Sequence, residues 1–193
     1  MRKRGFLRQN TKACRDEGQV TLVTGLFFIL FFSVLSVSFF QMEMIRSSSR
    51  YMEDALAASG LACALIDVRE YGSTHVLKIQ NGRESYEIYC KALKANLGLD
   101  DAWESHNHKL ISGVVQVEAF YVYNVLGESV DYCRLDDGRE EWMHGSLGEV
   151  SAPNGQVVEK TGVYGEISYP LKGIWGLKVQ ARKGKLVDVV GAD

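Results

Sequence analysis

The chain has 193 residues and a formal net charge of −2 at pH 7, with 24% charged and 46% hydrophobic residues. These averages are typical of a globular protein and exclude a disordered chain. The two prolines exclude a proline-rich array, and a pI near 6.1 gives no reason to expect nucleic acid as a partner. The averages conceal one asymmetry, because residues 18–42 contain no charged side chain.

This uncharged stretch predicts a transmembrane helix over residues 19–42. A helix needs about 20 mainly apolar residues to cross a hydrocarbon layer about 30 Å thick. The hydroxyls of its Ser and Thr residues can bond back to helix carbonyls. One alternative is a buried core helix, although such helices are rarely so long without a charge. Another is a cleaved secretory signal, which is shorter and ends in small residues, whereas this stretch ends in Phe39, Phe40 and Gln41.

Basic residues are concentrated before the apolar stretch. Residues 1–18 contain two acidic residues, Asp16 and Glu17, and six basic ones: Arg2, Lys3, Arg4, Arg8, Lys12 and Arg15. Positively charged flanks stay on the cytoplasmic side of a membrane. We therefore expect residues 1–18 to form a basic leader or cytoplasmic tail. The rest of this single-pass membrane protein is expected to be extracytoplasmic.

Beyond the membrane, the helical pattern continues over residues 43–70. Apolar residues recur there at spacings of three or four and predict one buried stripe: Met44, Tyr51, Ala55, Ala58, Ala62, Leu65 and Ile66. Ala57 to Gly60 is a run of small residues where another part of the chain could approach closely. Tyr71-Gly72-Ser73 indicates the end of this helix. A second helix is expected over residues 84–97, with Gly98 as its stop.

The remaining residues, 71–193, predict an extracytoplasmic α+β domain. From Lys109 onward the hydrophobic pattern has a period of two, with Val115, Val117, Ala119, Tyr121, Tyr123 and Val125 on one side and Gln116, Glu118 and Asn124 on the other. A further alternating segment covers 157–169. Residues 177–181 and 186–190 predict a hairpin around residues 183–185, and 138–155 is the loosest segment. The fold class is therefore α+β, a long amino-terminal helix plus a second helix packed on an antiparallel β-sheet, most simply a meander.

The four cysteines allow one bridge at most in the outer domain. Cys14 precedes the expected membrane helix, which leaves Cys63, Cys90 and Cys133 on the other side. Cys90 with Cys133 is one pairing, and Cys63 with either of them is another. Three free, buried thiols are the alternative to any bridge.

No catalytic, cofactor-binding or metal-binding residue is predicted, and we expect the protein not to be an enzyme. His106 and His108 would point the same way in a strand and could begin a metal site, but no further ligand is near them in sequence, which favours a solvated loop. The acidic pairs 100–101 and 140–141 are interpreted as solvated faces or helix-start charges. The sequence contains neither a G-x-S-x-G motif nor a phosphate-binding loop.

The amino-terminal layout resembles the type IV pilin superfamily, in particular the Tad-type pilin-like proteins (TadE-like pseudopilins) of bacteria. The matching features are the basic leader, Gly18 followed by Gln19, and an apolar helix that runs into an amphipathic one. In that family a membrane peptidase cuts after the leader glycine, which implies cleavage between Gly18 and Gln19. Many members carry Glu at the fifth mature position, where this chain has Val23. This departure is compatible with a minor subunit or an uncleaved relative.

The resemblance implies a structural, membrane-anchored minor subunit of a Tad or type IV pilus or a related secretion apparatus. Its partners would be the membrane and other pilin-like subunits or assembly proteins. Thr21 and Gly25 are spaced four apart on one helix face and are candidates for helix association, because helices in lipid pack closely at small residues. The alternative is a single-pass, membrane-tethered extracytoplasmic binding or sensing module without an assembly role.

Overall fold

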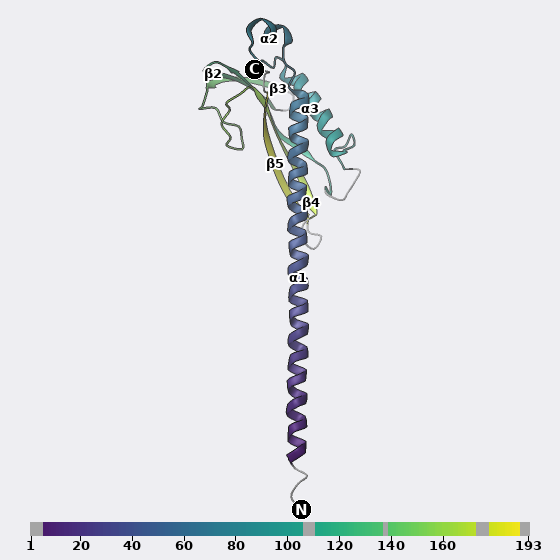
Figure 1. The fold of residues 1–193 in the computed structure, drawn as a ribbon. Helices are drawn as coiled ribbons and strands as arrows, with labels where there is room; N and C mark the ends of the chain where they lie inside the picture. The colour runs from purple at the N-terminus through teal and green to yellow at the C-terminus, as the bar shows by residue number, and fades with distance from the viewer. Residues whose placement is uncertain (1–5, 106–110, 137–138, 173–177, 190–193) are drawn as a thin grey trace, which may run out of the picture. The chain divides into compact units, whose positions relative to one another are not determined.

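A computed structural model describes residues 6–105, 111–136, 139–172 and 178–189, with side chains from Val20 onward (Figure 1). It confirms the α+β class. The helices are α1 (Phe6–Cys63), α2 (Val68–Thr74) and α3 (Gly82–Leu97). The strands are β1 (Gln116–Leu126), β2 (Ser129–Asp136), β3 (Arg139–Ser146), β4 (Gly162–Lys172) and β5 (Lys178–Asp188). The chain divides within α1 into two compact units, Met1–Ile45 and Arg46–Asp193.

The five strands form one antiparallel sheet in the order β3-β2-β1-β4-β5. Strands β1 to β3 form the expected meander, and Gly127, at a φ of 66°, provides the left-handed backbone of the turn from β1 to β2. A meander throughout was wrong, because β4 pairs with the other side of β1. The connection from β3 to β4 places Ala152 and Val158 on one face of the sheet, where both are buried.

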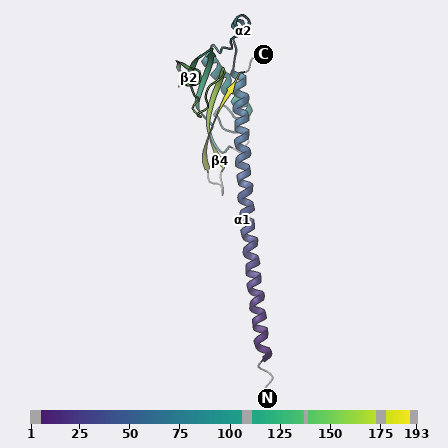
Figure 2. The same ribbon diagram turned by 60° about the vertical axis from the view of Figure 1, so that its left-hand side comes forward.

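The opposite face of the sheet packs against α3 and the carboxyl-terminal part of α1, as Figures 1 and 2 show from two directions. The contributors from the helices are fully or almost fully buried: Met52, Leu56 and Cys63 of α1, and Tyr89 and Leu93 of α3. The sheet contributes Phe120, Val122, Val163 and Ile167. Gly60 permits the close approach, since a Cβ there would lie 2.9 Å from Val187 Cγ2 of β5.

Both faces of β1 are apolar, which corrects the expected pattern. Phe120 and Val122 belong to the core under the helices, whereas Tyr123 belongs to a second core with Tyr164 and Leu186. The sequence pattern assigned a polar side to β1 because Gln116 and Glu118 are polar residues at alternate positions. Both lie at the start of the strand and are exposed. A bulge between Val117 and Ala119 interrupts the alternation there.

Helix α1 ends at Cys63, several residues before the expected position. Ile66 instead forms an isolated antiparallel bridge with Ile79. Asp67 then caps α2, because its Oδ1 accepts hydrogen bonds from the amides of Arg69 at 2.9 Å and Glu70 at 3.2 Å. Extended backbone at residue 66 and a new cap at residue 67 are incompatible with one uninterrupted helix.

The buried stripe of α1 also differs from the expected one. The buried positions after residue 46 are Ser48, Met52, Ala55, Leu56, Ser59, Gly60 and Cys63, whereas Met44, Tyr51, Ala58 and Ala62 are exposed. Most of the stripe is therefore displaced by about one residue. Small and polar residues such as Ser59 and Gly60 occupy the true interface, and hydrophobicity alone does not mark them.

Helix α3 confirms the second expected helix, with a start two residues earlier than predicted. Asn81 caps its amino terminus by accepting from the amide of Glu84 at 3.0 Å. Glu140 of β3 accepts from the amide of Arg83 at 2.7 Å. Gly98 ends the helix at a φ of 61°.

Two strand predictions were wrong. Strand β3 lies within the segment expected to be loosest, because it is a polar edge strand without an alternating pattern. Strand β5 is continuous through the expected turn at 183–185. Lys183 and Lys185 there form ion pairs with Glu53 at 3.1 Å and 2.7 Å. A Cβ on Gly184 would overlap the hydroxyl of Tyr164, so glycine is needed for packing and not for a turn.

Asn124 tethers the segment before α3 to the sheet. Its Oδ1 accepts from the Ile79 amide at 2.8 Å, and its Nδ2 donates to the Ile79 carbonyl at 3.0 Å. Both residues are fully buried. The amide side chain thus satisfies both backbone groups of the buried Ile79.

Candidate functional site

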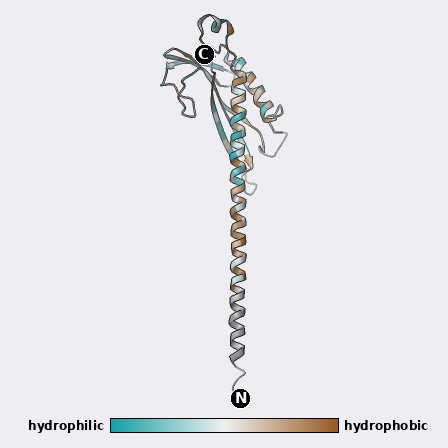
Figure 3. Cartoon of the chain, in the orientation of Figure 1, coloured by the Kyte–Doolittle hydropathy of each residue, from teal (hydrophilic) through white to brown (hydrophobic). Residues whose placement is uncertain are grey.

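The apolar stretch of α1 is the most distinctive surface of the chain. The helix is long and apolar enough within Val20–Cys63 to cross a membrane, and none of its most apolar window is buried by the chain itself. The large apolar side chains from Val20 to Phe40 are 47–74% exposed. Figure 3 shows this hydrophobic run along α1. A surface of this extent requires an apolar surrounding, such as lipid or other helices.

Four phenylalanines form a bulky cluster in the middle of this stretch. Phe27 stacks on Phe31 and Phe28 on Phe32, with ring centroids 6.3 Å and 6.4 Å apart. Both pairs have the spacing of one helical turn. Their side chains remain 49–63% exposed, so the cluster forms ridges on the helix surface.

Two hydroxyl groups of this stretch bond within the helix. Ser33 Oγ donates to the Ile29 carbonyl at 2.7 Å, and Ser38 Oγ donates to the Val34 carbonyl at 2.9 Å. A hydroxyl satisfied in this way needs no water. These two serines are therefore compatible with lipid.

The structure places Gly18, Gln19, Thr21 and Gly25 within α1. A Cβ on Gly25 would have no atom within 4 Å, and the positions of Thr21 and Gly25 are exposed. Their spacing puts them on one face, one turn apart. The side chain of Gln19 lies outside the described part of the chain, and cleavage between Gly18 and Gln19 stays a prediction.

Cys63, Cys90 and Cys133 are free thiols in the structure, and the pairing of Cys90 with Cys133 is not formed. Cys133 Sγ lies 3.1 Å from the position that a Cβ on Gly82 would occupy. Cys90 is eight residues farther along α3, or about 12 Å, whereas the Cα atoms of a disulfide are usually about 4.4–6.8 Å apart. Burial raises the pKa of Cys63 to about 12 and that of Cys133 to about 11, and it also raises the pKa of Cys90.

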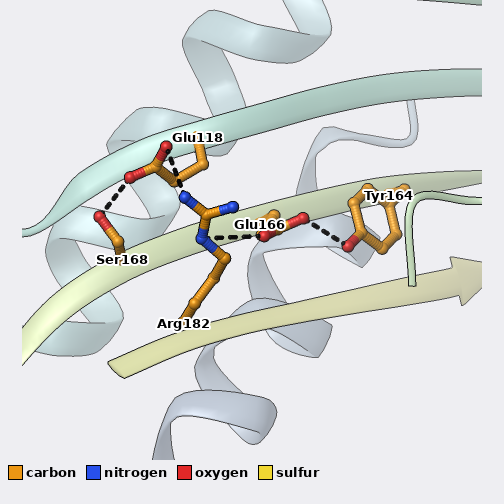
Figure 4. Close-up of polar contacts among 5 residues, drawn as sticks. All are labelled: Glu118, Tyr164, Glu166, Ser168 and Arg182. Carbon is orange, nitrogen blue, oxygen red and sulfur yellow. Dashed lines mark hydrogen bonds and ion pairs between the residues drawn. The ribbon is translucent and has the colours of Figure 1, made fainter. Parts of the chain in front are cut away.

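A polar network crosses β1, β4 and β5 on the face of the sheet that carries the second core (Figure 4). Arg182 lies between two carboxylates, with Nη2 3.4 Å from Glu118 Oε2 and Nε 3.4 Å from Glu166 Oε1. Ser168 Oγ donates to Glu118 at 2.5 Å, and the Tyr164 hydroxyl donates to Glu166 at 2.8 Å. Burial and then the bond to Glu166 raise the pKa of Tyr164.

The contacts of this network link neighbouring strands of the sheet. Each carboxylate is already engaged by a neighbouring strand, and the Ser168 hydroxyl donates to a carboxylate and not to a histidine that could activate it as a nucleophile. The sequence pattern missed this network because its members come from three strands and share no motif. It pins the register of β1, β4 and β5.

The residues considered for metal binding do not converge in the described part of the chain. His106 and His108 lie outside the described residues. His144 Nδ1 lies 2.7 Å from Asp131 Oδ1 at an exposed site. Among the described residues, no group of three or more His, Cys, Asp or Glu side chains could hold a metal ion.

The acidic pairs combine solvent exposure with structural contacts, since Asp101, Glu140 and Glu141 are exposed and Asp100 is half-buried. Asp100 Oδ1 accepts from the amide of Glu104 at 2.8 Å, and Asp101 lies 3.9 Å from Lys94. Glu140 binds the amino terminus of α3 as described above. A groove of about 490 Å³ is lined by residues 65–69, 80, 81 and 84. Its polar members are partly bonded to each other, since Gln80 Nε2 donates to Asp67.

Comparisons of the chain with models of protein families, with curated proteins and with solved structures found no match.

Proposed function

We propose that this chain is a structural, membrane-anchored, pilin-like subunit of a bacterial surface appendage or secretion apparatus. It is expected to act as a minor subunit, because Val23 stands where many major subunits carry a glutamate. The observation that carries the proposal is the apolar helix surface from Val20 to Phe40, which the chain itself leaves uncovered. Lipid covers such a surface before assembly, and helices of other subunits cover it afterwards.

The uncovered surface has a shape suited to helix packing. Gly25 leaves open space around its Cα, whereas the exposed rings of Phe28 and Phe32 project from the same side. Lipid provides no hydrophobic drive between helices, so close packing at small residues has to stabilise their association. A depression beside a ridge offers the close contact that such packing requires.

The basic leader supports an orientation with the amino terminus in the cytoplasm. In that orientation Cys14 is cytoplasmic and Cys63, Cys90 and Cys133 are extracytoplasmic. Single-cysteine variants in intact cells test this arrangement with a membrane-impermeant thiol reagent, followed by denaturation to reveal buried thiols. Labelling of Cys14 in intact cells would reverse the orientation, whereas protection of Cys133 alone would follow from its burial in the core.

Crosslinking in native membranes tests the assembly role. A photoreactive amino acid at Phe28 should form adducts with other pilin-like subunits. Gly25→Leu fills the neighbouring depression, so these adducts should fall at least severalfold while membrane insertion and the outer fold remain intact. Ser38→Leu is the matched control, because it also places leucine at a small residue but lies about 140° around the helix.

The two outcomes of this experiment are distinct. If the unaltered helix forms no protein adduct, the assembly role fails and a tethered binding or sensing module becomes the better explanation. If adducts form and both leucine variants leave them unchanged, the association uses a different face of the helix from Thr21 and Gly25.

A further inference from the structure

Strand β5 and the carboxyl-terminal part of α1 lie side by side and run in the same direction (Figures 1 and 2). Glu53 Oε1 of α1 lies 2.7 Å from Lys185 Nζ of β5. Farther along both elements, a Cβ on Gly60 would lie 2.9 Å from Val187 Cγ2. The beginning of β5 therefore lies toward the end of the domain at which Arg46 begins it, called the Arg46 end.

Two exposed valines lie at the Arg46 end of the sheet. Val179 of β5 pairs with Leu171 of β4, and Leu171 also forms an isolated bridge with Ile111. Val114 follows three residues after Ile111. Val179 is 53% exposed and Val114 is 41% exposed. The domain thus presents apolar side chains to its surroundings at this end.

Basic residues gather toward the same end. Arg46 and Arg50 are exposed on the first turns of α1 within the domain. Lys172 and Lys178 occupy the last paired position of β4 and β5, beside the pair that contains Val179. Apolar and basic residues together are typical of a surface that contacts the headgroup region of a membrane.

Acidic residues offset only part of this positive charge. Glu104 lies toward the Arg46 end, since its backbone bridges to Val114, and Glu43 follows the apolar stretch in sequence. Before Glu104 in the chain, Asp100 binds the Glu104 amide at 2.8 Å and Asp101 lies 3.9 Å from a lysine of α3. The four basic residues therefore outnumber Glu43 and Glu104, which leaves an excess of positive charge.

The chain enters this domain directly after the apolar stretch. The residues without charge end at Met42, four positions before Arg46. Four residues span at most about 14 Å in any conformation, and the headgroup layer on each side of the hydrocarbon is about 5–8 Å thick. Charges attract one another over about 8 Å at physiological ionic strength. With the apolar stretch in a membrane, the Arg46 end lies within reach of lipid phosphates.

We propose that the Arg46 end of the domain docks on the anionic lipid headgroups beside the membrane helix. Val114 and Val179 contact the headgroup layer, and the positive charge of the four basic residues attracts the lipid phosphates. The inference rests on the membrane anchor of the proposed function and deepens it, because it adds a second lipid contact outside the helix. This contact gives the domain a defined orientation on the membrane.

The test uses the full chain in nanodiscs of phosphatidylcholine alone, or of equal parts of phosphatidylcholine and phosphatidylglycerol. A photoreactive amino acid at Val179 should form lipid adducts, with a yield severalfold higher when phosphatidylglycerol is present. At Val68, which is 77% exposed and follows the other end of this part of α1, it should form few adducts in either lipid. At Phe28, in the apolar stretch, it reports membrane insertion and should form lipid adducts in both.

Two charge-matched pairs of substitutions test the role of the basic residues. Arg50→Gln with Lys178→Gln should lower the lipid adducts at Val179 in the anionic nanodiscs to about the level in phosphatidylcholine. Arg69→Gln with Lys160→Gln is the control, and it should leave these adducts unchanged. Both control residues are exposed and lie away from the Arg46 end, one in α2 and the other just before β4.

The outcomes separate docking from anchoring. Lipid adducts at Phe28 without any at Val179 would overturn the docking and leave the anchor intact. Equal adducts at Val179 in both lipids, or equal losses in both pairs of variants, would show proximity without recognition of charge and would also overturn it. Protein adducts in place of lipid adducts at Val179 would assign this end to another subunit. Absence of lipid adducts at Phe28 would refute the anchor, and the proposed function and the docking with it.

Discussion

Residues 20–45 and residues 46–63 belong to the same helix, but their large apolar side chains differ in solvent exposure. Between Val20 and Phe40, the large apolar residues are all exposed to at least 47%. In the second part, Met52 and Leu56 are at most 1% exposed. The first part is apolar on every side, as expected of a helix surrounded by lipid, whereas the second has one buried face, as expected of a helix on a domain core.

The two glycines of these parts illustrate the same difference. A Cβ on Gly25 would meet nothing within 4 Å, whereas a Cβ on Gly60 would lie 2.9 Å from Val187 Cγ2. Gly60 already has its neighbour within the chain, and Gly25 has none there. The comparison teaches that the domain of residues 46–193 uses the second part of α1 as a core element, while the described residues leave the first part uncovered.

Deleting the core part of α1 should have the largest effect. A fragment of residues 44–193 should be soluble and unfold in one cooperative transition, because it retains Met52, Leu56 and Cys63 in the core. A fragment of residues 69–193 should aggregate, since one face of its sheet is uncovered. Size-exclusion chromatography and circular dichroism compare the two. Equal stability of both fragments would contradict a core role for residues 46–63.

Removing the tether at Asn124 should have the next largest effect. Asn124→Ala leaves the amide and carbonyl of Ile79 buried without their partner. Each such group costs about 1–3 kcal/mol, so the free energy of unfolding of residues 44–193 should fall by about 2–6 kcal/mol in urea. Asn154→Ala removes a hydrogen bond to the Gln156 amide at an exposed turn. This control should change stability by less than about 0.5 kcal/mol, and similar losses in both variants would refute the tether.

Filling the contact at Gly60 should have a smaller effect. Overpacking costs about 1–3 kcal/mol, and replacing glycine by alanine in a helix returns about 1 kcal/mol. Gly60→Ala should therefore destabilise residues 44–193 by about 1 kcal/mol in urea unfolding. Adding Val187→Ala should cancel the overpacking in a double-mutant cycle. Gly72→Ala, at a helical glycine with open space around it, should be neutral or stabilising, and the same response at Gly60 would show that the contact with β5 is loose.

Elements with strong local signals were predicted well from the sequence. The apolar face of α3 and Gly98 act within one segment, so this helix was predicted with its end correct and its start two residues late. The apolar run from Val20 was equally clear because it depends on composition alone. The end of α1 was misplaced, since a bridge between Ile66 and Ile79 stops the helix and no local residue pattern reports that contact.

Contacts between distant segments account for most of what the sequence did not show. Asn124 was assigned to a polar side of β1, yet it is buried because its amide satisfies the backbone of Ile79. Residues 183–185 were predicted to form a turn. The sequence did not show that both lysines pair with Glu53 on α1, which is distant in sequence. The resemblance that led to the pilin-like proposal rests on residues 1–70 by pattern, and it stays a prediction for the crosslinking experiment.

The ion pairs of Glu53 should give the smallest effect and a defined pH dependence. Hydrogen bonds from Lys185 and Lys183 hold the pKa of Glu53 below its usual value of 4.5. A carboxyl whose pKa is lower in the folded state contributes stability above its unfolded pKa, and this contribution is lost as the pH falls through the folded pKa. Because the Glu53 side chain is 37% exposed, solvent screening should limit the contribution to less than about 1 kcal/mol.

Glu53→Gln in residues 44–193 tests this effect by urea unfolding at a series of pH values. The variant should be slightly less stable than the parent at pH 7, and the two should converge as the pH falls below 4.5. Glu159→Gln, at an exposed carboxyl in the segment between β3 and β4, is the control and should show a smaller difference at pH 7. A difference at Glu53 that persists unchanged into acid would mean that packing, and not charge, links this residue of α1 to β5.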